Sequence, residues 1–294
     1  MRKLREFCVP VRIEEASALL EKYGDNAMIY AGGSFIRGLD ARGLLSEVQA
    51  LIDIRKLGLG ELHSTSEGLR IGAMASFAQL GEAPEVGAEA WLGAVRDALA
   101  CPPLQIQNVS TVGGCLAASC PSFDLPVAFM ALDGRVTVVA AGARREMGLG
   151  ELFAGMFENS LSRNEIISEL VLPRQRGRIA SAFMKLEGNA NDLAIVNAAA
   201  SLAVDARGQC QTARVVLGGD VGDGVIRSTA AEELLHGQEL SDRQLQQAAE
   251  AVEQDIEPAS DHRASAAYRL AVAKVLAKRA LIEARGRLGL GGLK

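Results

Sequence analysis

The chain has 294 residues, of which 49% are hydrophobic and 23% are charged, and its formal net charge is -5. This length allows two or three domains with substantial cores. Nucleic acid is not expected as a main partner, because neutralising phosphates requires clustered Lys and Arg. No apolar run approaches the length that spans a bilayer. The basic start is not followed by the apolar segment of a secretory signal, so we expect a cytoplasmic protein.

The first 173 residues read as a mixture of helices and strands. Residues 13–23 have helical periodicity and are followed by Gly24, which is typical of a helix end. Residues 76–81 open another helix. Short apolar runs predict strands, in chain order, at 27–30, 50–54, 69–71, 135–140 and 166–172.

Composition changes at the polar, basic run 173–178, which we interpret as a solvated linker. Strands are predicted beyond it at 180–186, 197–204 and 213–217. Capping boxes at 229–232 and 241–244 then introduce helices. A last helix is expected from near Ala264 to Arg285, with an apolar face that carries Tyr268, Val272, Val275 and Ile282. The pattern favours an α+β protein, with a mixed segment to about residue 173 and a smaller β-then-α domain after it.

The cysteines and histidines form no recognisable catalytic or ligand pattern. Five cysteines occur without paired Cys-x-x-Cys spacing, and the three histidines are scattered at positions 63, 236 and 262. Structural zinc and all-cysteine iron–sulfur sites favour tighter groupings. We therefore expect no metal site and no catalytic residue on this chain, and we expect its chemistry to belong to a cofactor.

Adjacent glycines give the sequence its most distinctive loops. Gly-Gly pairs start at positions 32, 113, 218 and 291, although roughly three pairs are expected by chance, so a bare pair carries little information. The pair Gly32-Gly33 follows a short apolar run and precedes Ser34, and successive bare N–H groups of this kind suit an anion such as phosphate. Its spacing fits neither a Rossmann fingerprint nor a P-loop. The pair Gly113-Gly114 lies in the much longer pattern Gln105–Pro126, which ends in Pro-Ser-Phe-Asp-Leu-Pro.

The pattern Gln105–Pro126 resembles the second flavin-binding signature of the FAD-binding subunits of molybdenum hydroxylases, a family that includes aerobic carbon monoxide dehydrogenase and xanthine dehydrogenase. The loop Ala31–Ser34 is similar to the first glycine loop of that family. The likeness covers nearly the whole chain in the family's order. Its remaining matches are at Leu69–Ser76, Phe183–Leu186, Asn191–Asn197 and His262–Arg269.

This resemblance implies a two-subdomain FAD-binding fold of the vanillyl-alcohol oxidase (PCMH) type over residues 1–173, split near 55–60. A smaller carboxy-terminal α+β domain of the carbon monoxide dehydrogenase flavoprotein type, an antiparallel sheet plus helices, is implied for residues 178–294.

The resemblance also implies that both glycine loops hold the diphosphate of one noncovalently bound FAD. Backbone N–H groups of Gly32 to Ser34 would face phosphate from one side, and those of Thr111 to Cys115 from the other. Asp124 would accept a hydrogen bond from a ribityl or ribose hydroxyl, although it could instead cap a turn. Lys185 and Asp192 would lie near the isoalloxazine, and Leu193 close to its face or in the sheet core. The expected cofactor-binding residues are Ala31, Gly32, Gly33, Ser34, Phe35, Ile36, Ala73, Asn108, Thr111, Val112, Gly113, Gly114, Cys115, Asp124, Leu170 and Lys185.

By this resemblance the chain is an electron-transfer flavoprotein subunit of an oxidoreductase. A large molybdopterin subunit would oxidise the substrate, and an iron–sulfur subunit would pass electrons to the FAD of this chain. The FAD would deliver them to NAD or another acceptor, because flavin exchanges electrons singly or in pairs. The alternatives are a self-contained FAD oxidase of the same fold, and a non-catalytic scaffold that has lost FAD. Unusual residues at Phe35, Ile36 and Arg37 motivate the scaffold. Cys115 as a covalent flavin anchor is disfavoured, because the family binds FAD noncovalently.

Overall fold

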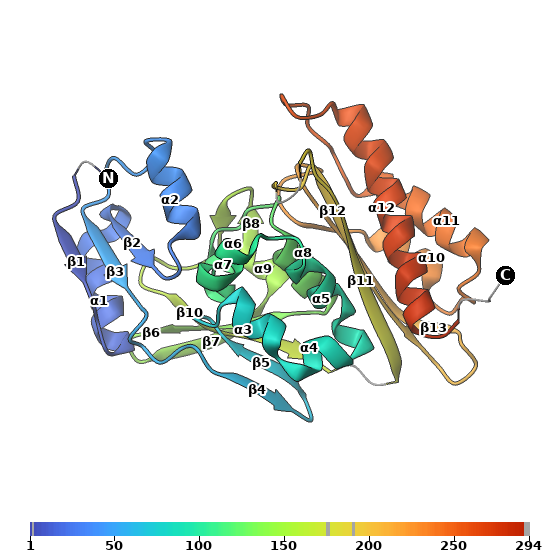
Figure 1. The fold of residues 1–294 in the computed structure, drawn as a ribbon, viewed down its shortest axis with the longest axis horizontal. Helices are drawn as coiled ribbons and strands as arrows, with labels where there is room; N and C mark the ends of the chain where they lie inside the picture. The colour runs from blue at the N-terminus through green and yellow to red at the C-terminus, as the bar shows by residue number, and fades with distance from the viewer. Residues whose placement is uncertain (2, 175–176, 190–191, 291–294) are drawn as a thin grey trace.

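The computed structural model describes residues 1, 3–174, 177–189 and 192–290. In this part of the chain the strands form three main sheets and a two-stranded hairpin. The three sheets follow one another along the long axis of the molecule in the order of the sequence, from the blue amino-terminal end to the orange and red carboxy-terminal end (Figure 1).

The first sheet is parallel, with the strand order β1-β3-β2. Parallel neighbours require crossover connections, and helices provide them here. Helix α1 buries Ala16 and Leu20 against Ile52 and Ile54, so its apolar stripe covers the central strand. The elements are β1 (Glu6–Cys8), α1 (Ile13–Tyr23), the 3₁₀ turn η1 (Gly24–Asn26), β2 (Ala27–Tyr30), α2 (Ser34–Ala41) and β3 (Ala50–Asp53).

The second sheet is antiparallel, with the order β4-β5-β10-β6-β7. Its strands are β4 (Leu62–Thr65), β5 (Gly68–Gly72), β6 (Arg135–Ala140), β7 (Ala143–Gly148) and β10 (Ile166–Pro173). Short helices connect and cover these strands, together with the hairpin of β8 (Phe153–Gly155) and β9 (Glu158–Asn159). The helical elements are α3 (Phe77–Glu82), α4 (Pro84–Ala88), η2 (Ala90–Leu92), α5 (Gly93–Leu99), α6 (Leu104–Val109), α7 (Val112–Ala117), α8 (Asp124–Ala131) and α9 (Leu149–Leu152).

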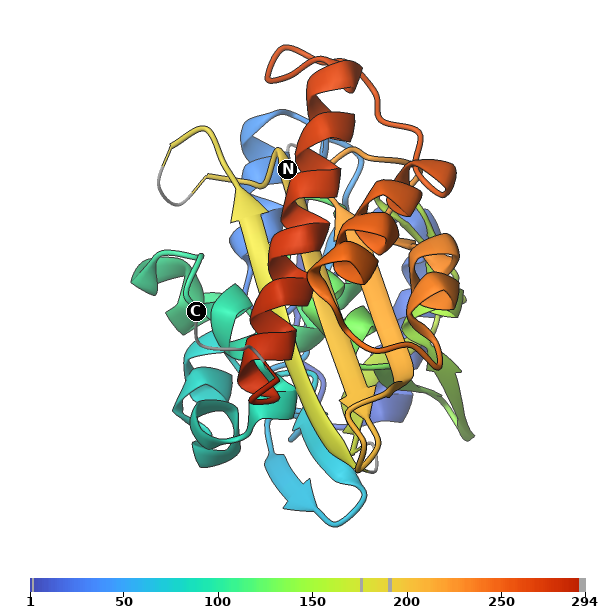
Figure 2. The ribbon, with the colours of Figure 1, turned by 90° about the vertical axis from the view of Figure 1, so that its right-hand side faces the viewer.

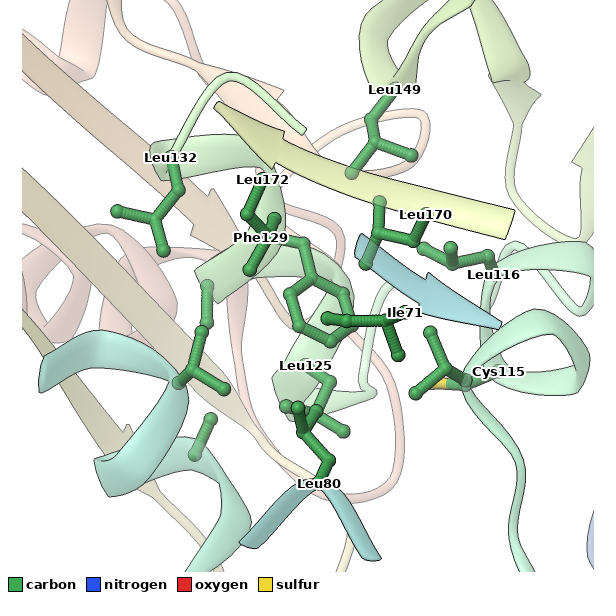
Figure 3. Packing of buried hydrophobic residues seen from close by; sticks show 14 of the residues in the cluster. Ile71, Leu80, Cys115, Leu116, Leu125, Phe129, Leu132, Leu149, Leu170 and Leu172 are labelled. Carbon is green, nitrogen blue, oxygen red and sulfur yellow. The ribbon is translucent and has the colours of Figure 1, made fainter. Parts of the chain in front are cut away.

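The largest core lies between the second sheet and these helices. Figure 3 shows Phe129 of α8 among Ile71 of β5, Leu125 of α8 and Leu170 of β10. Each of these four side chains is at most 1% exposed. This core fixes α7, which contains Gly113 and Gly114, and α8, which follows it in the chain.

The third sheet is antiparallel, with the order β11-β12-β13-β14, and α12 crosses it on the outer face (Figure 2). Helices α5 and α8 contact its other face. Strand β12 is therefore buried along its whole length, which explains why its sequence is almost continuously apolar. The elements are β11 (Arg178–Leu186), β12 (Val196–Val204), β13 (Cys210–Gly218), β14 (Ile226–Arg227), α10 (Thr229–Leu235), α11 (Asp242–Ala251), η3 (Val252–Gln254) and α12 (Ala266–Arg287).

The predicted strands and the predicted α+β class are confirmed, whereas three details of the helices were wrong. Ser241 caps α11 by accepting from Gln244 N, but the Gln244 side chain donates to Leu234 O and does not complete the predicted capping box. The first helix of the carboxy-terminal part is capped by Ser228, whose Oγ accepts from Ala231 N, and Glu232 pairs with Arg227 instead of completing a capping box with Thr229. On α12, the residues Tyr268, Val275 and Ile282 are 51%, 47% and 37% exposed. The buried face instead carries mainly small residues and leucines, because the helix lies close to the sheet.

Some expectations lie wholly or partly outside the described residues. These are the middle of the linker at 175–176, Asn191 and the glycine pair at 291–292. No helix in the described part of the chain has the length and apolar character needed to cross a membrane.

Candidate cofactor-binding site

The two glycine loops, far apart in sequence, lie against each other. The Ser34 and Ser110 hydroxyl oxygens are 2.8 Å apart, across 76 positions of sequence. A Cβ at Gly32 would overlap the carbonyl oxygen of Val109, so only glycine allows this approach of the two main chains. The structure therefore brings together the two loops that the sequence singled out.

The first loop offers unused hydrogen-bond donors. Gly33 has a φ of 75° and is the N-cap of α2, which begins at Ser34. Among the described residues, no acceptor contacts the main-chain N–H groups of Gly32, Gly33 and Ser34. Free N–H groups at the positive end of a helix favour an anion, so this loop can hold a phosphate.

The second loop differs, because the protein already uses its N–H groups. Thr111 is the N-cap of α7, and its Oγ1 accepts from Gly114 N at 3.2 Å. The N–H of Gly113 donates to Ala73 O at 2.8 Å, and that of Cys115 to Thr111 O at 2.9 Å. A Cβ on Gly113 would lie 2.5 Å from the Ala73 Cβ. Of the N–H groups expected to face phosphate from this side, those of Val112, Gly113, Gly114 and Cys115 therefore have acceptors within the protein.

A buried polar cluster follows the second loop at the start of α8. The Oδ2 of Asp124 accepts from Lys185 Nζ at 3.1 Å, and its Oδ1 lies 3.3 Å from Asn197 Nδ2. Lys185 also contacts Glu187 at 2.8 Å and donates to Asp192 O at 2.7 Å. The Asp124 and Lys185 side chains are only 9% and 7% exposed. The structure thus joins Asp124 and Lys185 in one cluster.

Burial and pairing shift the pKa values of this cluster. Burial raises the pKa of Asp124 above its usual value, although Lys185 and Asn197 oppose that shift. Burial lowers the pKa of Lys185, but attraction to Asp124 and the hydrogen bond to Glu187 outweigh it, so the net pKa is raised. The Lys185 ammonium is therefore a stable positive charge beside the second loop.

The other expected residues fall into three environments. Ala73, Val112 and Leu170 are core residues at most 2% exposed, and the N–H groups of Ala73 and Val112 donate to Ser168 O and Ala75 O. Asn108 is exposed on α6. Ala31 is 8% exposed and packs with the core of the first sheet.

The surroundings of two further expected residues, Ile36 and Cys115, are also defined by the structure. Ile36 packs against the apolar cluster of Leu45, Val48 and Leu51. Cys115 is buried, which raises the pKa of its thiol well above the usual value. A protonated, buried thiol is a poor nucleophile, which argues against Cys115 as a covalent anchor.

Phe123, Phe157 and Asn197 lie around the site but were not predicted as site residues from the sequence. The predicted residue Phe35 contacts the Phe123 ring edge to face, with centroids 5.7 Å apart, and stacks with the Phe157 ring at a centroid distance of 6.2 Å. These rings connect α2 to the segment before α8 and to the β8–β9 turn. Asn197 is fully buried within an apolar strand, and this lone amide was the one sequence signal that could have placed it in the site.

Comparisons with known protein families identify the family to which this chain belongs. Residues 2–175 match the family of the FAD binding domain in molybdopterin dehydrogenase, and residues 181–284 match the CO dehydrogenase flavoprotein C-terminal domain. The chain belongs to the FAD-binding subunits of the molybdenum hydroxylases. It is a flavoprotein subunit of an oxidoreductase, and FAD is its cofactor.

Relatives of this family align over nearly the whole chain. The subunit alpha of the 6-hydroxypseudooxynicotine dehydrogenase complex of Paenarthrobacter nicotinovorans is 32% identical, with 96% of this chain and 95% of the relative covered. The carbon monoxide dehydrogenase medium chain of Hydrogenophaga pseudoflava is 30% identical, with 96% and 97% covered. A solved structure of carbon monoxide dehydrogenase from Hydrogenophaga pseudoflava superposes with a TM-score of 0.91 at 28% identity, covering 98% of this chain and 99% of that chain.

The described residues fit FAD on their own chemistry. Unused N–H donors of the first loop suit a diphosphate, and the Asp124 carboxylate is a hydrogen-bond acceptor suited to a hydroxyl. The Asn197 Nδ2 faces Asp124, whereas its Oδ1 lies close to Gly218 and has no hydrogen-bond partner among the described residues.

Proposed function

We propose that this chain takes electrons from the iron–sulfur clusters of a partner subunit and passes them to NAD or another acceptor. FAD would supply the redox chemistry, because it exchanges electrons singly or in pairs. The main support for the proposal is that the two glycine loops are in contact and that the Asp124–Lys185 cluster lies beside them. The relatives support it, since their names describe subunits of larger dehydrogenases and hydroxylases.

The residues of this chain would bind and orient the cofactor. The N–H groups of Gly32, Gly33 and Ser34 would hold the diphosphate. Asp124 would accept from a hydroxyl of the cofactor, and the positive charge of Lys185 would favour electron-rich, reduced flavin. We propose the full set of sixteen residues named from the sequence as the cofactor contacts, with the second loop contributing its close-packed surface.

We further propose that the partners are an iron–sulfur subunit and a large molybdopterin subunit, and that FAD is held noncovalently. A domain boundary within 173–178 agrees with the two family matches on either side of it. The five cysteines are free thiols, which suits a reducing compartment, so we propose a cytoplasmic location.

The acceptor can be tested directly on the purified, FAD-loaded chain. The flavin is reduced without oxygen by light and a sacrificial donor, and NAD is then added. If NAD is the acceptor, the oxidised flavin spectrum returns as NADH absorbance appears. Reoxidation by a quinone or dye but not by NAD contradicts the NAD part of the proposal. A chain that retains no flavin after reconstitution supports the scaffold instead.

A further inference from the structure

Two arginines at the start of α12 donate hydrogen bonds to main-chain carbonyl groups beside the candidate site. Arg263 precedes the helix, and Arg269 lies in its first turn behind the N-cap Ser265. The Arg269 side chain is fully buried, and that of Arg263 is 21% exposed. Both belong to the stretch 262–269, which carries the family resemblance but has no role in the site as described.

Their guanidinium groups hold two separate main-chain segments. The Nη1 of Arg263 lies 3.4 and 3.3 Å from two successive carbonyl oxygens, and the Nη1 of Arg269 lies 2.8 and 3.2 Å from two others. The four acceptors are Leu193 O, Ala194 O, Ile195 O and Gly219 O. The arginines therefore tie the segment before β12 to the segment after β13.

These two segments in turn hold the chain that carries Asp124. The N–H of Ala194 donates to Ser122 O at 3.3 Å, and that of Gly219 donates to Pro121 O at 2.8 Å. A Cβ on Gly219 would lie only 2.6 Å from Ile195 O, so the two segments are in close main-chain contact. Residues 121–124 are thus held by main chain that the arginines fix.

Two aspartates pair with the two arginines and help to hold them in place. Asp220 Oδ2 lies 2.8 Å from Arg263 Nη2 and 3.2 Å from Arg269 Nη1. Burial disfavours the charged form of Asp261, yet hydrogen bonds from Ala264 N and Arg269 hold its pKa well below the usual range. The planar guanidinium of Arg presents five N–H donors in a fixed geometry, whereas the three donors of Lys all share one nitrogen.

We propose that Arg263 and Arg269 are positioning residues of the cofactor site. By fixing segments 193–195 and 219–220, they set the position of Asp124 and of the exposed Leu193 side chain next to FAD. This inference rests on the proposed assignment of Asp124 to the site.

The test uses the full-length chain with Arg263→Gln, because replacing the fully buried Arg269 is expected to unfold part of the domain. Arg279→Gln is the matched control, since Arg279 is exposed on the same helix and has no ion pair among the described residues. Dissociation constants for FAD, thermal stability and the visible circular dichroism of flavin at saturation are measured. We expect Arg263→Gln to stay folded, to weaken FAD binding by roughly 5- to 30-fold and to change the dichroism. Arg263→Lys should fail to restore either property, and the control should match the parent.

Two results would overturn the proposal while leaving the site intact. One is a folded Arg263→Gln with the affinity and dichroism of the parent. The other is a loss of stability with an unchanged dichroism spectrum at saturating FAD, which would mean a purely structural role. An Asp124→Asn variant with parental FAD affinity would instead contradict the site assignment, and this inference with it.

Discussion

The two glycine loops look alike in sequence but differ in how their main-chain N–H groups are hydrogen-bonded. In the first, three main-chain N–H groups have no acceptor among the described residues. In the second, the N–H groups of Gly113 and Gly114 donate to Ala73 O and Thr111 Oγ1. In both pairs the first glycine is required by a neighbouring main chain, Val109 for Gly32 and Ala73 for Gly113. A Gly-Gly pair therefore marks close packing of main chain as strongly as it marks a ligand.

Gly32→Ala should have the largest effect on this comparison. The new Cβ would overlap the Val109 carbonyl, so one loop must move away from the other. We expect a loss of about 3 kcal/mol or more in the free energy of unfolding, together with loss of bound FAD. Urea unfolding and the flavin content of the purified protein measure both. Parental stability in this variant would show that the loops are not in close contact.

Asp124→Asn should weaken FAD binding by roughly 1–3 kcal/mol, because a charged acceptor is lost. The apoprotein should stay folded, since the amide is close in shape and Lys185 keeps Glu187 as a partner. Titration of the apoprotein with FAD gives the affinity. The exposed surface pair of Asp25 and Arg163 supplies the control Asp25→Asn, which should bind FAD like the parent. Unchanged affinity in Asp124→Asn would remove Asp124 from the site.

Gly114→Ala tests whether the second loop contacts FAD or only packs against the rest of the protein. Its Cβ would lie 2.8 Å from Thr111 Oγ1, a side-chain atom, and 3.9 Å from the Ala31 Cβ. We expect a loss of stability of about 1 kcal/mol or less, with a clear fall in FAD retention. Equilibrium unfolding and flavin retention on desalting test this. Full retention of FAD would mean that the second loop only supports the first.

The pH dependence of stability should show the smallest effect. The raised pKa of Lys185 means that its charge stabilises the fold below the unfolded pKa of about 10.4. This contribution is lost as the pH rises through the higher folded pKa. Lys185→Met should therefore lose less stability than the parent between neutral and strongly alkaline pH, as followed by urea midpoints. Lys278→Met, on α12, is the control and should follow the parent; an equal slope in Lys185→Met would contradict the buried pairing.

Local patterns in the sequence predicted the regular elements well. The helix 13–23 and the strands 27–30 and 135–140 have the predicted bounds, because each has a clear period and a glycine or turn at its end. Helices α2, α6, α7 and α8 were missed, because stretches of six to eight residues show little helical period. The buried face of α12 was also wrong, because alanines that fit close to a sheet are weak signals of burial.

The site was predictable as a set of residues but not as a set of bonds. Ser-Thr ahead of the second glycine pair did not reveal that Thr111 would cap α7 and occupy Gly114 N. The pairing of Lys185 with Asp124 joins residues 61 positions apart, and such a contact depends on how α8 packs on the third sheet. The bonds from Arg263 and Arg269 to distant carbonyl groups depend on tertiary structure in the same way.

The central claim is that this chain transfers electrons through FAD and leaves substrate oxidation to a partner. The most direct measurement is turnover by the purified, FAD-loaded single chain. Purines, aldehydes, aromatic heterocycles and carbon monoxide are tested with a dye acceptor, before and after addition of iron–sulfur and molybdopterin subunits. We predict no oxidation of these compounds by the chain alone, and turnover with reduction of its flavin once the partners are present. Sustained turnover by the chain alone, without molybdenum, would contradict the account and favour a self-contained oxidase.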